Sequence, residues 1–285
     1  MEYLFLAVAS VGVAVQNIFK KKYNNKKSGG VFLFSAMTVL VACLFFVVIN
    51  RDWYYAPGMI RHSFGFAVYY SMAAVFGVLA IREGSLAKTN LISSFSLLIP
   101  SFYGILFLGE PTKATLFIGI AVLAAALVLI NYTKEKDDKK ATYRWLIYVA
   151  LCFIGNGMCS TVQKIEIMTF GSEGKNVFMI IALLMSAAVL FGVSLFSSDE
   201  RAKARDTVKS GTLLAVLCGL FNGLVNLFVM LLNGMLPASV MFPVISAAGV
   251  TIVFIYSSVV EKEKFTNYQK LGYLLGVIAI ILLNL

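Results

Sequence analysis

Amide and hydroxyl side chains recur at helical spacing inside several long apolar stretches of this chain, and these are the groups that could do chemistry. One stretch places Asn156, Ser160 and Gln163 at i, i+4 and i+7, on one face of a helix. Another places Asn222 and Asn226 one turn apart. Polar groups in apolar surroundings cost free energy unless they line a cavity or find partners. The stripes therefore predict a polar cavity for a solute, or else hydrogen bonds between helices.

We expect these residues to line a cavity, and we add polar residues of three further apolar stretches to its predicted lining. The candidate substrate-binding residues are Gln16, Asn17, Tyr69, Tyr70, Asn90, Ser94, Asn156, Ser160, Gln163, Asn222 and Asn226. The alternative stays open: hydrogen bonds between membrane helices are worth about 0.6 kcal/mol each on average.

Charged residues stand only at the ends of the apolar stretches, as at Arg82, Glu110, Lys164 and Glu263. A pump that exchanges cations for protons needs a carboxylate near the middle of the membrane. Its absence favours a neutral or zwitterionic solute. A structural, helix-capping role is expected for Glu110 and Glu263, and Arg82 is expected at the mouth of the bundle, where it could also meet a substrate carboxylate.

Catalytic and metal chemistry find little support in the sequence. His62 is the only histidine, and Cys43, Cys152, Cys159 and Cys218 lie inside apolar stretches without metal-ligand spacing. We expect small packing cysteines, no catalytic residue, no metal, no cofactor and no enzyme.

The elements that must position these residues are membrane spans. Hydrophobic residues make up 60% of the chain, charged residues only 13%, and the mean hydropathy is +0.86. A helix needs about 20 residues to cross the hydrocarbon core of a bilayer. Ten stretches approach that length: Tyr3–Phe19, Val31–Ile49, Ser63–Ile81, Asn90–Leu108, Ala114–Tyr132, Trp145–Val162, Asn176–Phe196, Thr212–Leu232, Leu236–Val260 and Phe265–Asn284.

The ten spans divide into two similar groups of five. Gly12 to Lys21 aligns without gaps with Gly155 to Lys164, and a glutamate precedes a glycine by nine residues near the end of each half. Five is an odd number, so the second group must enter the membrane from the opposite side. The expected fold class is an all-α integral membrane protein of two inverted five-helix repeats, 1–133 and 143–285, joined by a polar linker, 134–142.

The run from Ser85 to Ile130 resembles the EamA repeat of the drug/metabolite transporter superfamily. Leu108-Gly109-Glu110 matches the "LGE" helix end of that repeat closely, whereas the second half has Glu261-Lys262-Glu263 there. Pro243, Glu263 and Gly272 preserve the outline. The resemblance covers nearly the whole chain. It implies transport across a membrane, with the equivalent spans lining a central cavity, and it does not identify the substrate.

The distribution of basic residues and the resemblance to the EamA repeat predict opposite orientations of the chain in the membrane. Most of the 24 basic residues follow odd-numbered spans. The positive-inside rule therefore places the lysine cluster and the linker in the cytoplasm and both termini outside. EamA-like proteins are generally drawn with cytoplasmic termini. The net charge of +10 is attributed to these loops and to anionic lipid headgroups, so no nucleic-acid partner is expected.

The expected function is a secondary transporter that moves a small polar metabolite, neutral or zwitterionic, by alternating access, as an exporter or exchanger. A broad-specificity drug exporter and a non-transport receptor or structural bundle remain alternatives. The expected partners are the solute and the lipid bilayer, and the expected location is the plasma (inner) membrane of a bacterium. The pairs Gly219/Gly223 and Gly272/Gly276 have GxxxG spacing, which we attribute to packing within one chain, so a monomer is expected rather than a dimer.

Overall fold

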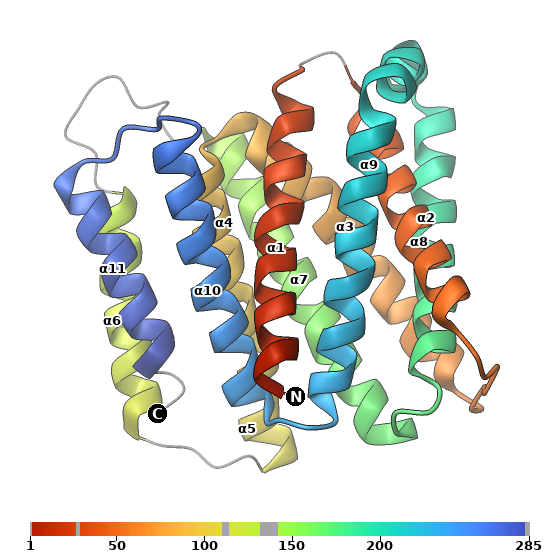
Figure 1. Cartoon of the computed structure of the whole chain (residues 1–285), viewed down its shortest axis with the longest axis horizontal. Coiled ribbons are helices and arrows are strands. Elements are labelled where there is room, and N and C mark those ends of the chain that lie inside the picture. Colours follow the sequence, from red (N-terminus) through yellow and green to blue (C-terminus); the bar gives the residue numbers. More distant parts are fainter. Residues whose placement is uncertain (1, 27–28, 110–113, 132–141, 283–285) are drawn as a thin grey trace.

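Every element in the described part of the computed structural model is a helix (Figure 1). The described residues are 2–26, 29–109, 114–131 and 142–282. The helices are α1 (Glu2–Asn24), α2 (Val31–Ile49), α3 (Met59–Glu83), α4 (Leu86–Ser94), the 3₁₀ turn η1 (Phe95–Leu97), α5 (Leu98–Leu108), α6 (Ala114–Asn131), α7 (Tyr143–Phe170), α8 (Lys175–Phe196), α9 (Ser198–Asn233), α10 (Ala238–Val259) and α11 (Asn267–Leu282).

Within the described residues, eight helical segments are long and apolar enough to cross a membrane. They correspond to eight of the ten expected spans, with α4, η1 and α5 forming one of them. The other two expected spans fall on α6 and α11, which are helices of 18 and 16 residues. The all-helical membrane class is therefore confirmed, while the count of ten spans and the inverted repeats stay predictions.

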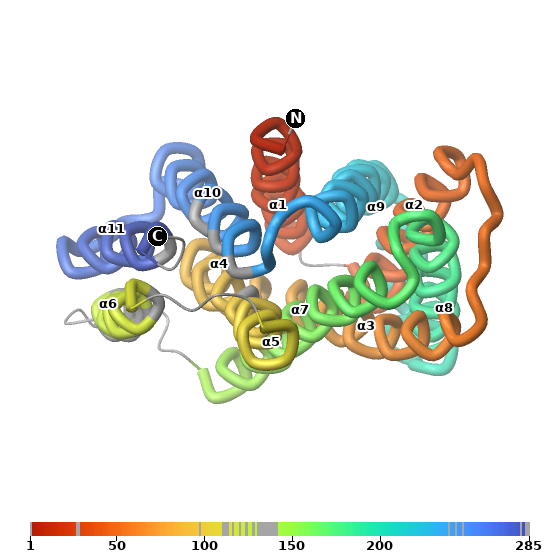
Figure 2. The backbone as a smooth tube through the Cα atoms, turned by 90° about the horizontal axis from the view of Figure 1, so that it is seen from below, coloured from red at the N-terminus to blue at the C-terminus, as the bar shows by residue number. Residues whose placement is uncertain are grey.

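The helices stand side by side as one bundle, elongated in cross-section (Figure 2). Helix α3 packs along α7, and α1 packs along α9. Helix α2 packs against both α8 and α9, and α6 pairs with α11 at one end of the long axis. Helices α1, α3, α7 and α9 thus occupy the middle of the molecule. Most of the polar residues singled out in the sequence lie on these helices.

Helix α9 is much longer than the expected span Thr212–Leu232. It begins at Ser198, because Ser197 caps its first turn by accepting from the backbone N–H of Glu200. The buried Glu200 carboxylate in turn accepts from the N–H groups of Val31 (2.8 Å) and Leu33 (3.1 Å) at the start of α2. The basic segment before Thr212 is therefore the first part of helix α9 and not a loop, and its Glu200 caps the neighbouring α2.

Helix α7 also exceeds its expected bounds, Trp145–Val162, and continues to Phe170. The additional turns carry Lys164 and Glu166, which are 4% and 1% exposed. The sequence placed Lys164 at the end of an apolar stretch, where solvent would be within reach. Instead both side chains are enclosed by the ends of neighbouring helices.

The fourth expected span is interrupted in the middle, where η1 separates α4 from α5. Pro100 has no N–H to donate to the carbonyl of Ser96, and its ring disfavours a regular preceding turn. The carbonyl of Ser94 accepts from the hydroxyl of Ser246 on α10. Gly157 approaches this break closely, since a Cβ there would lie 2.6 Å from the Ser96 carbonyl oxygen. At Pro243, by contrast, α10 is one helix throughout.

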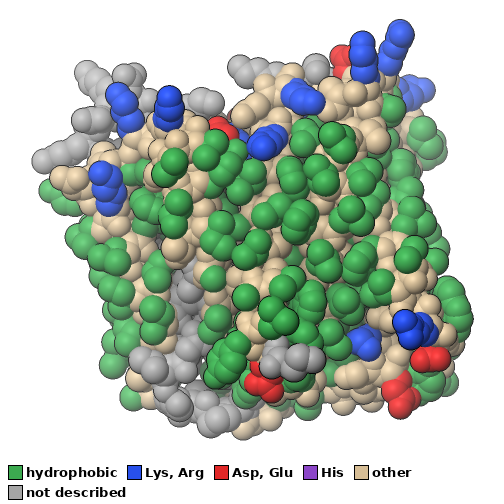
Figure 3. All heavy atoms as spheres, viewed as in Figure 1, with side chains coloured by type: hydrophobic (Ala, Val, Ile, Leu, Met, Phe, Trp, Pro, Cys, Tyr) green, Lys and Arg blue, Asp and Glu red, His purple; other side chains and the backbone are tan. Residues whose placement is uncertain are grey.

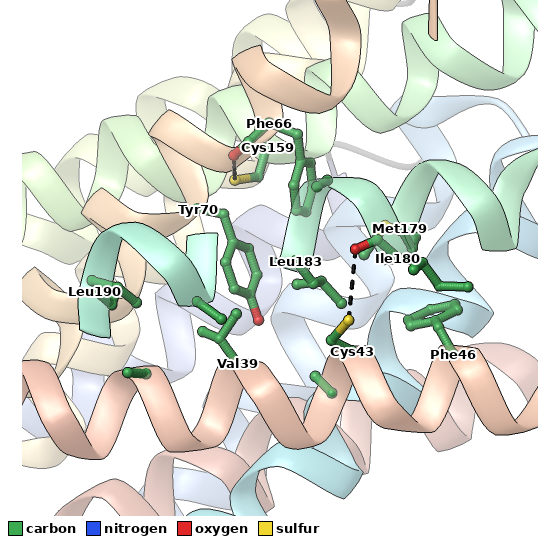
Figure 4. Close-up of a cluster of buried hydrophobic side chains, with 14 of the residues drawn as sticks. Val39, Cys43, Phe46, Phe66, Tyr70, Cys159, Met179, Ile180, Leu183 and Leu190 are labelled. Carbon is green, nitrogen blue, oxygen red and sulfur yellow. Dashed lines mark hydrogen bonds between the residues drawn. The ribbon is translucent and has the colours of Figure 1, made fainter. Parts of the chain in front are cut away.

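The largest apolar cluster lies among α2, α3, α7 and α8 (Figure 4). Phe46, Phe66 and Leu183 are fully buried there, and two cysteines help to join the helices. Cys43 Sγ donates to the carbonyl of Ile180 at 3.6 Å, and Cys159 Sγ donates to the carbonyl of Phe66 at 3.9 Å. This apolar cluster packs beside the polar centre of the bundle.

Lysine and arginine side chains gather at one end of the bundle, the upper end in Figure 3. On the face shown, the opposite end carries fewer basic side chains, and acidic ones lie beside them. Helix α1 starts and α11 ends at that opposite end (Figure 1). The positive-inside rule therefore still favours a cytoplasmic location for the basic end of the bundle and an external location for the two termini.

A single cysteine tests this orientation. Asn25 is exposed directly after α1, so an Asn25→Cys change in a cysteine-free background gives one accessible thiol. We expect it to resist an impermeant maleimide in intact cells and to react after the cells are opened. Ready labelling of intact cells would reverse the orientation.

Candidate solute-binding cavity

A cavity of about 180 Å³ lies in the middle of the bundle, between α1, α2, α3, α4, η1, α7, α9 and α10. A volume of this size is on the order of a dozen times the space that one buried water needs. Ten of the eleven candidate residues line it, namely Gln16, Asn17, Tyr70, Asn90, Ser94, Asn156, Ser160, Gln163, Asn222 and Asn226. Residues from both halves of the sequence thus surround one space.

Tyr69 is the exception, because it packs beside the apolar cluster and does not line the cavity. Successive residues of a helix point about 100° apart, so the rotation of α3 that directs Tyr70 into the cavity turns Tyr69 toward the apolar cluster. Figure 4 shows Tyr70 beside Phe66, with its hydroxyl pointing toward α2. Among the candidate residues, Tyr69 thus lies outside the wall of this cavity.

Four amides form a continuous hydrogen-bonded chain across the cavity wall. Gln163 Nε2 donates to Asn226 Oδ1 at 2.8 Å, and Asn226 Nδ2 donates to Asn222 Oδ1 at 3.0 Å. Asn222 Nδ2 donates to Gln16 Oε1 at 2.8 Å, and the Tyr70 hydroxyl donates to Asn222 Oδ1. The two expected alternatives, cavity lining and hydrogen bonds between helices, are therefore both realised by the same side chains.

A second polar group lines the cavity from the α4 side. Asn17 Nδ2 donates to Asn90 Oδ1, which leaves the Nδ2 of the buried Asn90 without a hydrogen-bond partner among the described residues. The hydroxyls of Ser35 and Ser96 also line the cavity, and they too lack partners in the described part of the chain. Buried polar groups are nearly always hydrogen-bonded, so these atoms are candidates to contact water or a solute.

Several polar residues line the cavity that the polar stripes of the sequence did not predict. They are Ser93 on α4, Ser96 on η1, Ser35 and Thr38 on α2, and Ser246 on α10, all of which are small hydroxyl residues that are also common in membrane helices as packing residues. Lys20 was missed for a different reason: it was counted as a loop charge. Val13, Gln16, Asn17 and Lys20 all line the cavity, at i, i+3, i+4 and i+7, and this spacing could have revealed Lys20.

The other charged groups singled out in the sequence lie outside the cavity. The Nδ1 of His62 is 2.7 Å from Glu166 Oε2 at one end of the bundle. Arg82 donates from Nη2 to the carbonyl of Gly29 at 3.0 Å, so its guanidinium joins helix ends. Glu110 lies outside the described residues.

Glu263 joins two helix ends. Its Oε2 accepts from the hydroxyl of Ser85 at 2.8 Å, and Ser85 is the N-cap residue of α4. The carboxylate thus contacts the N-terminus of α4 rather than that of α11. At the start of α11, Thr266 and Gln269 form a reciprocal capping box instead. Burial raises the pKa of Glu263 above the usual value for a glutamate. The structural role expected for Glu263 matches this geometry.

All four cysteines are free and buried. Within the described ranges, no group of three or more His, Cys, Asp or Glu side chains could hold a metal ion.

The fold and the site together define an all-helical membrane protein with a polar cavity inside its bundle. One solved structure, described as "Crystal structure of protein", has the same fold, with a TM-score of 0.63 over 99% of this chain and 98% of that chain. Its sequence is 13% identical, so the likeness concerns the fold alone. Altogether 28 solved chains match, which shows that this helix arrangement recurs. No protein-family model and no curated protein matches the chain.

Proposed function

We propose that this protein is a secondary transporter that moves a small polar metabolite across the membrane by alternating access, as an exporter or exchanger. The observation that carries the proposal is the central cavity, with amide and hydroxyl groups from seven helices and η1 directed into a bundle that exposes many large apolar side chains. Membrane transporters typically bind their solutes near the midplane, at the interface between two repeats. The resemblance to the EamA repeat points the same way.

The register of the lining residues supports two related halves. In the alignment of Gly12 with Gly155, the four α1 lining residues correspond to Asn156, Cys159, Ser160 and Gln163 on α7. All eight positions line the cavity. Two helices from different halves therefore present equivalent stripes to one space, as inverted repeats around a shared site would do.

Helix contacts repeat this correspondence. A Cβ at Gly12 would lie 2.6 Å from Val225 on α9, and a Cβ at Gly155 would lie 2.8 Å from the backbone nitrogen of Ala73 on α3. When the two halves are exchanged, the pair α1–α9 becomes α7–α3, and these are both extensive contacts. The ten-span inverted repeat, with units 1–133 and 143–285, follows from this proposal.

The lining chemistry favours a neutral or zwitterionic solute over a cationic drug. Amide oxygens and hydroxyls can hydrogen-bond either end of a polar solute, and apolar side chains such as Phe34, Val39 and Phe242 can receive its hydrocarbon part. Among the described lining residues there is no carboxylate that could neutralise a cation. A broad-specificity drug exporter is the second candidate, favoured only by these aromatic and aliphatic surfaces. We propose a monomer in the bacterial plasma membrane, without an enzymatic activity or a cofactor.

Uptake into proteoliposomes tests the function. Purified protein is reconstituted and given radiolabelled amino acids, nucleosides and amines, with protein-free vesicles as the control. We expect saturable uptake or counterflow of at least one small polar solute. Absence of transport across the whole panel would favour the receptor or structural alternative.

Coupling should not depend on Glu263. Glu263 does not line the cavity, and its Oε2 accepts from Ser85, a hydrogen bond that the amide oxygen of glutamine can also accept. Glu263→Gln should therefore leave uptake driven by a pH gradient within about twofold of the wild type. If the variant lost gradient-driven uptake but kept solute exchange, this helix-end glutamate would be the proton site.

A further inference from the structure

Lys20 is the one charged side chain among the described residues that line the cavity. Helix α1 continues past the expected end of the first span to Asn24, so Lys20 stays on the helical stripe of Gln16 and Asn17. Its ammonium group lies deep beside α3, because a Cβ at Gly77 would be 3.8 Å from the Nζ atom. The lysine is therefore directed inward and not toward the headgroups.

This ammonium has no hydrogen-bond or ion-pair partner in the described ranges. Other charged groups near that end of the bundle are engaged: Arg82 binds the Gly29 carbonyl, and Lys26 Nζ donates to the Ser210 carbonyl at 2.6 Å. A partly buried cation without a counter-charge is costly unless water or a ligand compensates it. Lys20 thus resembles a binding group rather than a structural one.

A second unpaired donor lies on the same side of the cavity. Asn17, one turn before Lys20, donates to Asn90 Oδ1, and the Nδ2 of Asn90 has no partner in the described part of the chain although the residue is only 3% exposed. Lys20 and Asn90 offer N–H donors to the cavity, and both atoms lack an acceptor. A ligand group that accepts two or more hydrogen bonds and carries negative charge fits this arrangement.

The position equivalent to Lys20 on α7 is the neutral Gln163, which is engaged with Asn226. One side of the cavity is therefore positive and the other side is neutral and polar. The lining gives a bound solute a preferred direction, with its anionic end at α1 and α4.

We propose that Lys20 and Asn90 bind the carboxylate of the transported solute, which is a small zwitterionic amino acid. The inference rests on the transport function proposed above and names its substrate class. A single ammonium with amide donors matches the one negative charge of a carboxylate. A phosphate, with two charges and three acceptor oxygens, is more often held by several cationic groups.

The test compares acids with their amides. Purified wild-type protein and the variants Lys20→Met, Lys20→Arg and Lys22→Met are assayed for thermal stabilisation and for proteoliposome uptake. The probes are the proteinogenic amino acids, lactate, the corresponding carboxamides and inorganic phosphate. Lys22 is the matched control, because it is on the same helix, is exposed and does not line the cavity.

We expect the wild type to bind and transport one or more acids, and not the matching amides. Lys20→Met should weaken binding of those acids by about ten- to hundredfold, as expected for a lost charged hydrogen bond. Lys20→Arg should retain part of the affinity, and Lys22→Met should retain all of it.

Three results would overturn the carboxylate site. They are equal responses to acids and amides, equal behaviour of Lys20→Met and Lys22→Met, and a response to phosphate alone. If neutral solutes or amines are transported and Lys20→Met has no effect, the substrate class is refuted while the transport function stands. If no solute is transported or bound, the transport function fails and the carboxylate site fails with it.

Discussion

Replacing Asn222 by alanine is expected to lower solute uptake at least tenfold while leaving the amount of folded protein nearly unchanged. Asn222 is the centre of the amide chain, where it accepts from Tyr70 and Asn226 and donates to Gln16. Its loss removes a solute-facing amide and releases three neighbours that then change orientation. The cost in stability should be modest, because such bonds contribute about 0.6 kcal/mol each and the released groups face a polar cavity.

Initial uptake rates in proteoliposomes, normalised to the amount of folded protein, measure this effect. Asn25→Ala is the matched control, since Asn25 is exposed and makes no side-chain contribution to the cavity. Similar losses are expected for Asn156, Gln163 and Asn226. If all four alanine variants failed to fold, or if those that folded transported normally, these residues would be structural hydrogen-bonding groups only.

The second large effect concerns stability at the contact between α3 and α7. A Cβ at Gly155 would lie 2.8 Å from the backbone nitrogen of Ala73 and 2.8 Å from the carbonyl oxygen of Tyr69. Backbone atoms cannot move aside as a flexible side chain can. Gly155→Ala should therefore force the two helices apart and destabilise the protein by about 1–3 kcal/mol, the usual range for overpacking.

Gly65 provides the matched control, because it is on α3 itself and a Cβ there would meet no atom within 4 Å. Gly65→Ala should raise stability by up to about 1 kcal/mol, since alanine is the better helix former. Unfolding of both variants in detergent micelles, followed by heat or denaturant, measures the difference. Equal stability of the two variants would show that the α3–α7 contact adjusts without strain.

Gly219 and Gly223, the GxxxG pair on α9, are used within the chain. A Cβ at Gly219 would lie 2.6 Å from the carbonyl oxygen of Thr38, and one at Gly223 would lie 2.6 Å from the ring of Phe45. Both neighbours are on α2, so this pair brings α9 against α2, as the sequence analysis expected. The spacing alone could not say which helix would be the partner.

The sequence determined the class of the protein and most of its polar centre. Inside a membrane only helices and closed barrels satisfy the backbone, and uniformly apolar runs of about 20 residues favour helices. The helical period could then place Asn156, Ser160 and Gln163 on one face. These inferences depend only on local periodicity and hydropathy. For the same reason the fourth span was predicted, although its interruption by the 3₁₀ turn at Phe95–Leu97 was not.

Only the tertiary structure decided how each helix is rotated and where each one ends. Tyr69 and Tyr70 are equally polar neighbours, and the packing of α3 on α7 and α8 turned Tyr70 to the cavity and Tyr69 away from it. Lys20 is another case, because a lysine near a span end can reach the headgroups or the interior. Hydropathy gives the depth of such a residue but not its direction around the helix. That direction is set by contacts far apart in the sequence, such as Gly12 of α1 against Val225 of α9.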